Sequence, residues 1–262
     1  MKQKIIFGPA GLGGVSEAVD NLHKLKELGL EACEIAFTYG TYIKKKEDAE
    51  KIGNEAKKLG ISLSIHAPYW INLNSVEQEK IEKSKQRILE SCKVGTWLQA
   101  TKVVFHPGYY GKSSKKDTYE KIKNEMLDLQ KSINEKNYTV KLAPETTGKV
   151  NVFGSIDEIK ELIDDTNCSF CIDFAHILAR YGSYNFDEIE KKFRRFNEWH
   201  IHFSGIEYGE KGEKRHLRLE KNNIKKLIEN LPKEKKFTII SESPSPVEDS
   251  VVSLEVYKDK NK

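Results

Sequence analysis

The sequence predicts a single-domain α/β protein: a (β/α)8 barrel whose active site lies at the carboxyl ends of its strands. Strand-like apolar runs recur eight times, and amphipathic helical segments separate them. The length of 262 residues suits such a barrel, which typically takes about 250. No Pro- or Gly-rich linker divides the chain, so we expect residues 1–262 to form one domain.

The eight expected strands are short and apolar. Runs such as VVF, IIF and FTII are apolar on both faces, as strands buried between an interior and a layer of helices require. The strands are expected at residues 4–8, 31–37, 61–66, 101–106, 139–145, 169–173, 198–204 and 237–242. An open, doubly wound sheet is the competing architecture. It usually carries a glycine-rich phosphate loop, and GPAGLGG near the N-terminus does not match that pattern.

Helical periodicity marks the segments between the strands. Within residues 15–28, the side chains of Val19, Leu22, Leu25 and Leu28 form one apolar stripe. Further helices are expected at residues 76–98, 117–133, 156–163, 186–193 and 224–231. Alternation of strands and helices favours parallel strands with helices outside them.

Composition and charge exclude few functions. The net charge of +4 permits a polyanionic partner but does not require one. No apolar run is long enough to cross a bilayer, and the N-terminus has no signal-peptide core, so we expect a cytoplasmic protein without a membrane partner. Only Cys168 and Cys171 are close, as C-x-x-C. Because no second pair completes a zinc site, we interpret the cysteines as free thiols in a reducing compartment.

The third to eighth strands each end in a histidine or an acidic residue. In order, these residues are His66, His106, Glu145, Asp173, His202 and Glu242. Two further histidines, His176 and His216, are expected in the loops beyond the strand ends. Because the carboxyl ends of barrel strands meet at one mouth, these eight residues, which we call the rim residues, should lie together.

Such a group requires cations. Carboxylates crowded in a cleft repel one another and lose hydration, and divalent metal ions remove both penalties. Nitrogen and oxygen ligands without a thiolate suit zinc, and manganese is the second choice. The D-x-x-H spacing of Asp173 and His176 lets them serve neighbouring ions. His200 shares a strand face with His202 and is expected one layer deeper, and His23 is interpreted as a structural residue of the first helix.

In combination, the motifs resemble endonuclease IV over nearly the whole chain. The matching segments, in order, are HAPYWINL (66–73), FHPGYYG (105–111), PETTG (144–148), CIDFAHILA (171–179), WHIHFSG (199–205), RHLRLE (215–220) and SESPSP (241–246). The resemblance implies a monomeric (β/α)8 barrel with three zinc ions that acts on double-stranded DNA. It also implies cleavage of the phosphodiester 5′ to an abasic site, leaving a 3′-hydroxyl and a 5′ deoxyribose phosphate.

The resemblance further assigns a metal-binding role to every rim residue. Glu145, the expected catalytic residue, would bridge two ions. The first ion would be held by His66 and His106, the second by Asp173, His202 and Glu242, and the third by His176 and His216.

Two departures from the family pattern change what we expect. The family's D-R-H becomes Lys214-Arg215-His216, and a protonated lysine cannot bind a metal ion. We therefore expect two firmly bound ions and a third bound conditionally, with Glu213, in a flexible loop, as a possible replacement ligand. Among residues expected to contact DNA, Tyr69 matches the family tyrosine and Trp70 its neighbouring wedge. Tyr42 lies in the loop where the family carries a positive charge.

Two alternative functions stay open. Sugar isomerases and epimerases share this barrel, and their single-metal set looks like Glu145, Asp173, His202 and Glu242. The additional histidines favour the nuclease, because a one-metal enzyme does not need them. The second alternative is a non-catalytic nucleic-acid-binding protein that has kept the barrel, an interpretation to which Lys214 lends slight support.

Overall fold

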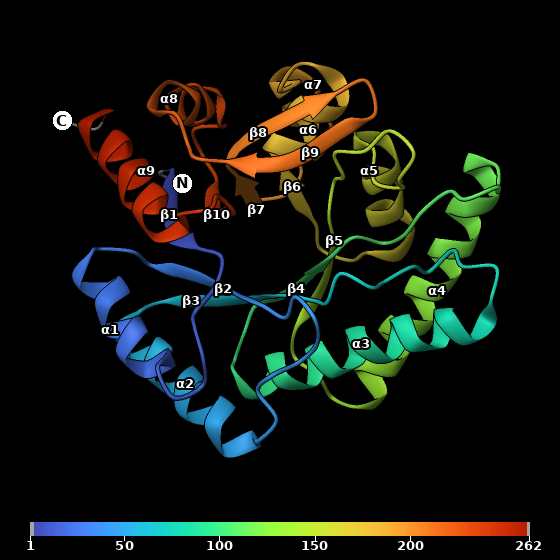
Figure 1. Cartoon of the computed structure of the whole chain (residues 1–262), viewed down its shortest axis with the longest axis horizontal. Helices are drawn as coiled ribbons and strands as arrows, with labels where there is room; N and C mark the ends of the chain where they lie inside the picture. Colours follow the sequence, from blue (N-terminus) through green and yellow to red (C-terminus); the bar gives the residue numbers. More distant parts are fainter. Residues whose placement is uncertain (1–2, 261–262) are drawn as a thin grey trace.

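Eight parallel strands close into a barrel in the computed structural model, which describes residues 3–260 and confirms the expected fold (Figure 1). The barrel strands are β1 (Lys4–Pro9), β2 (Ala32–Ala36), β3 (Ser62–His66), β4 (Lys102–Phe105), β5 (Lys141–Pro144), β6 (Cys171–Asp173), β7 (Glu198–Phe203) and β10 (Lys236–Ser241). They pair as two parallel sheets, β1-β10-β7-β6 and β2-β3-β4-β5. Parallel bridges between Ala10 and Glu34 and between Glu145 and Cys171 join the two sheets and complete the barrel.

Helices surround the barrel on its outer side (Figure 1). The expected helices are present as α1 (Ala18–Glu27), α3 (Gln78–Trp97), α4 (Lys115–Glu135), α5 (Ile156–Thr166), α7 (Phe186–Phe193) and α8 (Lys221–Asn230). Three helices were not expected from the sequence: α2 (Lys46–Leu59), α6 (Phe174–Tyr181) and α9 (Pro246–Lys260). The buried face of α2 consists of Ala49, Ile52, Gly53 and Ala56, so Ile52 is its only large apolar residue.

An antiparallel hairpin, which was also not expected, follows β7. It consists of β8 (Gly205–Gly209) and β9 (Gly212–Leu217) and lies beside α6 in Figure 1. The four residues from Glu213 to His216 are polar, so β9 lacks the alternating apolar residues that identify a strand. The expectation that His176 and His216 lie in loops is therefore wrong, because α6 carries His176 and β9 carries His216.

Side chains alternate between the two faces of each strand, and this alternation directs some polar residues into the barrel. In β2, Cys33 and Ile35 belong to the large apolar core, while the intervening Glu34 contacts His200 of β7. His200 and His202 therefore share the interior face of β7. The barrel thus has an apolar outer face under the helices and a partly polar interior, and this polar interior continues upward into the mouth.

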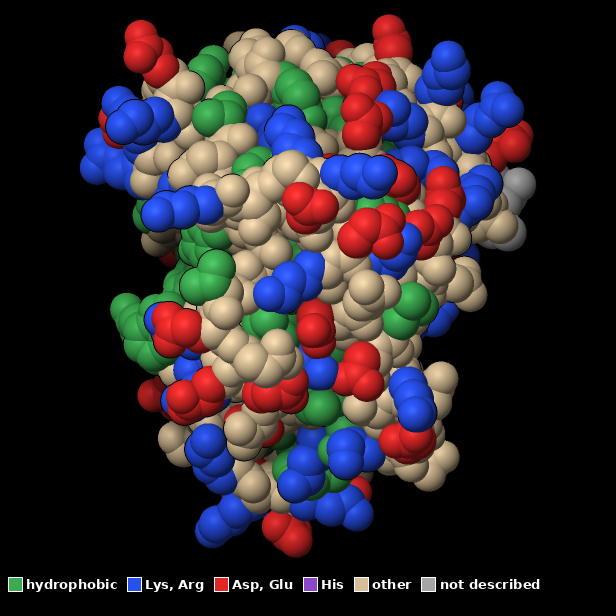
Figure 2. All heavy atoms as spheres, turned by 90° about the vertical axis from the view of Figure 1, so that its right-hand side faces the viewer, with side chains coloured by type: hydrophobic (Ala, Val, Ile, Leu, Met, Phe, Trp, Pro, Cys, Tyr) green, Lys and Arg blue, Asp and Glu red, His purple; other side chains and the backbone are tan. Residues whose placement is uncertain are grey.

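The outer surface carries charges of both signs. Figure 2 shows the face where α4 lies, with lysine and arginine side chains interspersed among aspartate and glutamate. This face therefore has no large field of a single sign. No helix within residues 3–260 is long and apolar enough to cross a membrane, and a cytoplasmic location stays a prediction.

Candidate metal centre

All eight rim residues converge at the carboxyl end of the barrel. Their potential ligand atoms form three groups, and within each group the atoms lie within 4.8 Å of one another. The groups are His66, His106 and Glu145; Asp173, His176 and His216; and Glu145, Asp173, His202 and Glu242. The structure thus brings together the residues that the sequence singles out, and it divides them as a site for several ions would.

Glu145 lies at the centre of this arrangement and is fully buried. Its Oε2 atom lies 3.2 Å from His66 Nε2 and 3.1 Å from His106 Nε2. Its Oε1 atom lies 3.3 Å from His176 Nδ1 and 3.1 Å from His202 Nδ1. Burial opposes ionisation of this carboxyl, but His202 and His106 hold its pKa well below the ordinary value. A carboxylate that faces imidazoles with both oxygens is suited to bridging two cations.

Hydrogen bonds fix the orientation of three rim imidazoles. His66 Nδ1 lies 2.8 Å from the main-chain carbonyl of the next residue, and His176 Nδ1 lies 3.0 Å from the carbonyl of Thr146. His216 Nδ1 lies 2.7 Å from the Ser204 hydroxyl. In each ring the Nε2 atom is left to face the mouth. Anchoring one ring nitrogen in this way is characteristic of histidines that bind metals.

Buried polar atoms without partners indicate where cations fit. Among the described residues, Asp173 Oδ2 and His176 Nε2 are buried side-chain atoms without a hydrogen-bond partner. Burial raises the pKa of Asp173, and the Glu145 charge adds to this effect. Buried polar groups nearly always have a partner, and a divalent cation would serve both atoms. The donor set therefore fits a divalent metal.

A β-bulge decides which residue of β9 faces the mouth. Glu207 pairs with Arg215, whereas the next residue, Tyr208, pairs with Glu213. Lys214 is therefore an extra residue in the ladder, and a bulge of this kind shifts the alternation of side chains by one position. As a result the Lys214 side chain is directed to Glu207 and the Glu213 side chain to His176.

Contacts on both sides of the bulge agree with this reversal. Lys214 Nζ lies 3.4 Å from Glu207 Oε1, whereas Glu213 Oε2 lies 3.4 Å from His176 Nε2. The Glu213 amide donates to the carbonyl of Gly148 at 3.2 Å. A Cβ at Gly148 would lie 2.7 Å from the Glu213 Cβ, so glycine is required for this approach. The suggestion that Glu213 lies in a flexible loop is wrong, because it lies within β9.

Sequence reasoning missed Glu34, a fully buried acid one layer below the rim. Its Oε2 atom accepts hydrogen bonds from Ser64 Oγ at 2.7 Å and from His200 Nε2 at 2.9 Å. Its Oε1 atom lies 2.8 Å from His202 Nε2. Burial opposes ionisation of Glu34, but His202 and His200 lower its pKa well below the ordinary value.

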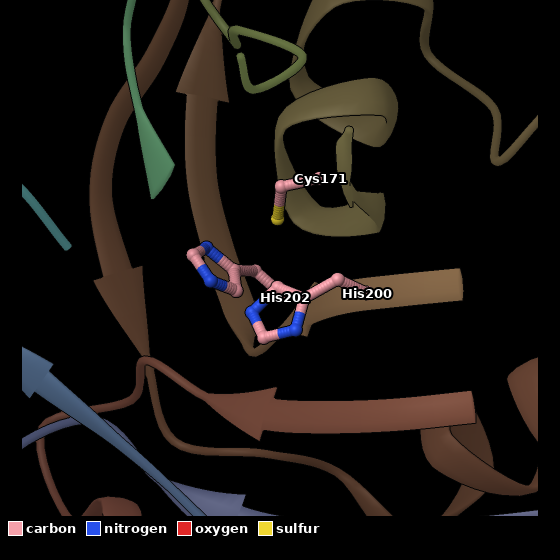
Figure 3. Close-up of side chains that lie close together, drawn as sticks. All are labelled: Cys171, His200 and His202. Atoms are coloured by element: carbon pink, nitrogen blue, oxygen red, sulfur yellow. The ribbon is translucent and has the colours of Figure 1, made fainter. Parts of the chain in front are cut away.

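Cys171 of β6 gathers with His200 and His202 of β7 in the barrel interior (Figure 3). Their potential ligand atoms also lie within 4.8 Å of one another. Burial raises the pKa of the Cys171 thiol well above its ordinary value, although His202 opposes the shift. Because the thiol is neutral and Nε2 of both imidazoles lies against Glu34, we assign this group to the support of the centre. All four cysteines are free and buried, as expected.

The mouth opens into a cleft of about 670 Å³ with aromatic walls. Tyr69 and Trp70 line it and are 59% and 62% exposed. Tyr42 is not among the lining residues. It packs edge-on against Phe37 with ring centres 5.3 Å apart, and its hydroxyl donates to the carbonyl of Gly13 at 3.1 Å. A DNA contact through Tyr42 therefore stays a prediction without support from its position.

Comparison with known proteins identifies the family. The profile of the xylose isomerase-like TIM barrel family matches residues 22–260, and the chain belongs to this family. An uncharacterized protein of Methanocaldococcus jannaschii is 40% identical over 97% of both chains.

Relatives with named activities are more distant. A probable endonuclease 4 of Thermoplasma volcanium is 34% identical over 51% of this chain and 47% of its own length. The solved structure of endonuclease IV from Thermus thermophilus has a TM-score of 0.71 at 19% identity, covering 97% of this chain and 99% of that one. A D-tagatose 3-epimerase-like protein reaches a TM-score of 0.69 at 20% identity, covering 97% and 96%. At these identities the structural matches support the fold alone.

Proposed function

We propose that this protein is a metal-dependent endonuclease of DNA repair that hydrolyses the phosphodiester 5′ to abasic sites. The products would carry 3′-hydroxyl and 5′ deoxyribose phosphate ends. The endonuclease 4 relatives support this proposal; several match about half of the chain, and one matches 73% of it. We propose zinc as the metal because the rim offers nitrogen and oxygen ligands without a thiolate, and manganese is the second choice.

The surplus of imidazoles carries the proposal. A sugar epimerase with one ion would be served by the group of Glu145, Asp173, His202 and Glu242. Four more histidines face the same mouth, and each belongs to a second or third group of potential ligand atoms: His66, His106, His176 and His216. Several cations close together suit phosphodiester hydrolysis, in which both the attacking and the leaving oxygen need stabilisation.

The chain's own residues would divide the work as follows. Bound divalent ions would supply Lewis acidity and lower the pKa of a water toward neutrality. Glu145, which faces imidazoles with both carboxylate oxygens, would hold two ions, and it would guide the proton that leaves the attacking water. Asp173, His202 and Glu242 would hold a second ion together with Glu145. His176, His216 and Glu213 would hold a third.

Selectivity for damaged DNA would come from the cleft walls. An abasic nucleotide has already lost its stacking, so it costs least to extrude from the duplex. Tyr69 and Trp70 are exposed beside the centre and could fill the gap that it leaves. Stacking on such side chains is worth about 1–3 kcal/mol per base. We expect the protein to act as a monomer on double-stranded DNA.

One experiment separates the proposed nuclease from its rivals. Purified protein is loaded with zinc or manganese, and its bound ions are counted. It is then assayed on a duplex with one abasic site, on the intact duplex and on ketose sugars. The proposal predicts two or three ions and chelator-sensitive nicking of the abasic strand only. One ion with ketose turnover would establish the epimerase. If the protein binds abasic DNA, and wild type and Glu145→Gln show the same residual nicking, it is a non-catalytic binder.

A further inference from the structure

We propose that Glu34 is the positioning residue of the metal centre: it fixes the ring of His202 so that Nδ1 presents its lone pair to the cation site. This inference rests on the proposed metal-dependent function and extends it to the barrel interior. Glu34 itself is one layer too deep to touch a substrate, because it is fully buried and acts through His202.

Glu34 is held by contacts from two other strands. Ser64 of β3 donates to its Oε2 atom at 2.7 Å, and His200 of β7 donates to the same atom through Nε2 at 2.9 Å. The remaining oxygen, Oε1, has no hydrogen-bond partner among the described residues, and neither has His202 Nε2; the two atoms lie 2.8 Å apart as an ion-pair contact. A buried carboxylate with an otherwise unpartnered oxygen strongly favours a donor at that nitrogen.

The orientation of His202 differs from that of the other rim imidazoles. His66 and His176 have Nδ1 against main-chain carbonyls and direct Nε2 toward the mouth. In His202 the inner nitrogen is Nε2, which lies against Glu34, while Nδ1 lies 3.1 Å from Glu145 and 3.4 Å from Glu242. His176 Nδ1 also lies 3.3 Å from Glu145, but its Nε2 faces Glu213. Within residues 3–260, no main-chain carbonyl accepts a hydrogen bond from the His202 ring. Glu34 therefore holds Nε2 of the His202 ring in place, as the main-chain carbonyls hold Nδ1 of the His66 and His176 rings.

The chemistry follows from the two tautomers of a neutral imidazole. With the proton on Nε2, His202 places its N–H beside the Glu34 carboxylate, 2.8 Å from Oε1, and its Nδ1 lone pair is free to bind a cation. With the proton on Nδ1, the ring presents N–H to the cation site and cannot bind. A carboxylate beside Nε2 stabilises the first tautomer and adds basicity to the ring, as outer carboxylates do in metal sites. The side-chain amide of glutamine has only one accepting oxygen. It therefore cannot stabilise an Nε2–H group on His200 with one oxygen and an Nε2–H group on His202 with another.

Glu34→Gln is the direct test, since it keeps the volume and removes the second acceptor. Zinc affinity is measured by competition with a chromophoric chelator, and the His202 tautomer is read from ring nitrogen shifts in ¹⁵N NMR of the metal-free protein, recorded above the pH at which the same spectra show the ring to have become neutral. We expect affinity to fall about 10- to 100-fold and the Nε2–H tautomer to lose its dominance. Unchanged affinity together with an unchanged tautomer would overturn the proposal.

Two controls separate positioning from general destabilisation. Ser64→Ala removes one hydrogen bond to Glu34 but leaves both imidazole contacts, so its zinc affinity should stay within about threefold of wild type. Glu158→Gln changes another buried glutamate, which binds Tyr110 and caps α5 away from the rim. It should lower thermal stability without changing zinc affinity. A loss of affinity in Glu158→Gln equal to that in Glu34→Gln would reduce Glu34 to a structural role.

The outcome is independent of the nuclease assay. If wild-type protein binds zinc but cuts no abasic DNA, the proposed function fails, while the effect of Glu34→Gln on affinity still decides the inference. If wild-type protein cuts abasic DNA and Glu34→Gln binds zinc with unchanged affinity, the function stands and the inference fails.

Discussion

Replacing Glu213 by glutamine should remove the third ion from the centre while leaving the other two in place. The bulge in β9 turns Glu213 toward His176, with 3.4 Å between Oε2 and Nε2. Its side chain is 19% exposed and has no other ion pair among those found in the described residues. The substitution should therefore change the stability of the metal-free protein by less than about 0.5 kcal/mol.

The size of the effect on the metal-loaded protein follows from linkage. At a free metal concentration 100 times the dissociation constant, one ion stabilises the fold by about 2.7 kcal/mol. If the loss of one carboxylate ligand weakens the third site ~100-fold, the same concentration leaves about 0.4 kcal/mol. The unfolding entropy of a chain of 262 residues is about 0.55 kcal/mol/K. The difference of roughly 2.3 kcal/mol thus lowers the melting temperature by about 4 °C.

Calorimetry with and without zinc measures the melting temperature, and elemental analysis measures the number of bound ions. Lys214→Gln is the matched control, because Lys214 is adjacent in the chain but points to Glu207. It should keep the full zinc-induced shift and all the ions. The bulge argument is refuted if Glu213→Gln keeps the same shift and ion count, or if Lys214→Gln loses them.

Three further predictions concern protonation, chemistry and DNA contact. Burial lowers but Glu145 raises the pKa of His66, to about 9 overall, and the pKa values of His176 and His202 are also raised, so these rings hold protons in the metal-free protein at neutral pH. The contribution of His66 to metal-free stability is complete below about pH 6.5 and is lost as pH rises through about 9, whereas zinc affinity rises over that range because protons must leave the rim imidazoles. Calorimetry in buffers of different ionisation enthalpy would detect the released protons, and affinity independent of pH would contradict this prediction. Glu145→Gln should lower the single-turnover rate of abasic-strand nicking by at least about 100-fold with an unchanged circular dichroism spectrum, and near-normal nicking would remove Glu145 from the chemistry. Trp70→Ala should weaken binding of abasic duplex by about 1–3 kcal/mol in fluorescence anisotropy while barely changing the melting temperature, and equal affinity would exclude a wedge role.

The sequence predicted the barrel because its strands carry their signal locally. Each strand is a short apolar run, and the run ends where the rim residues begin, as in VFH at His106 and SIH at His66. The convergence of the rim residues then follows from topology alone, because parallel barrel strands all end at the same mouth. This part of the site required no knowledge of side-chain contacts.

The missed features depend on pairing between distant segments. Glu34 stands in the middle of β2, and nothing near it in the chain reveals that its partners come from β3 and β7. The inward orientation of Glu213 depends on the bulge at Lys214, which exists only through the register between β8 and β9. Local sequence patterns contain neither the partner nor the register, so both features required the three-dimensional structure.

The number of ions that the folded chain binds tests the central claim most directly. The protein is stripped with a chelator, reloaded with zinc and passed through a desalting column. Its zinc content is then measured by elemental mass spectrometry. The account predicts two ions retained per chain and a third that appears when free zinc is supplied. A chain that retains one ion or none, and whose melting temperature is the same with and without zinc, would contradict it.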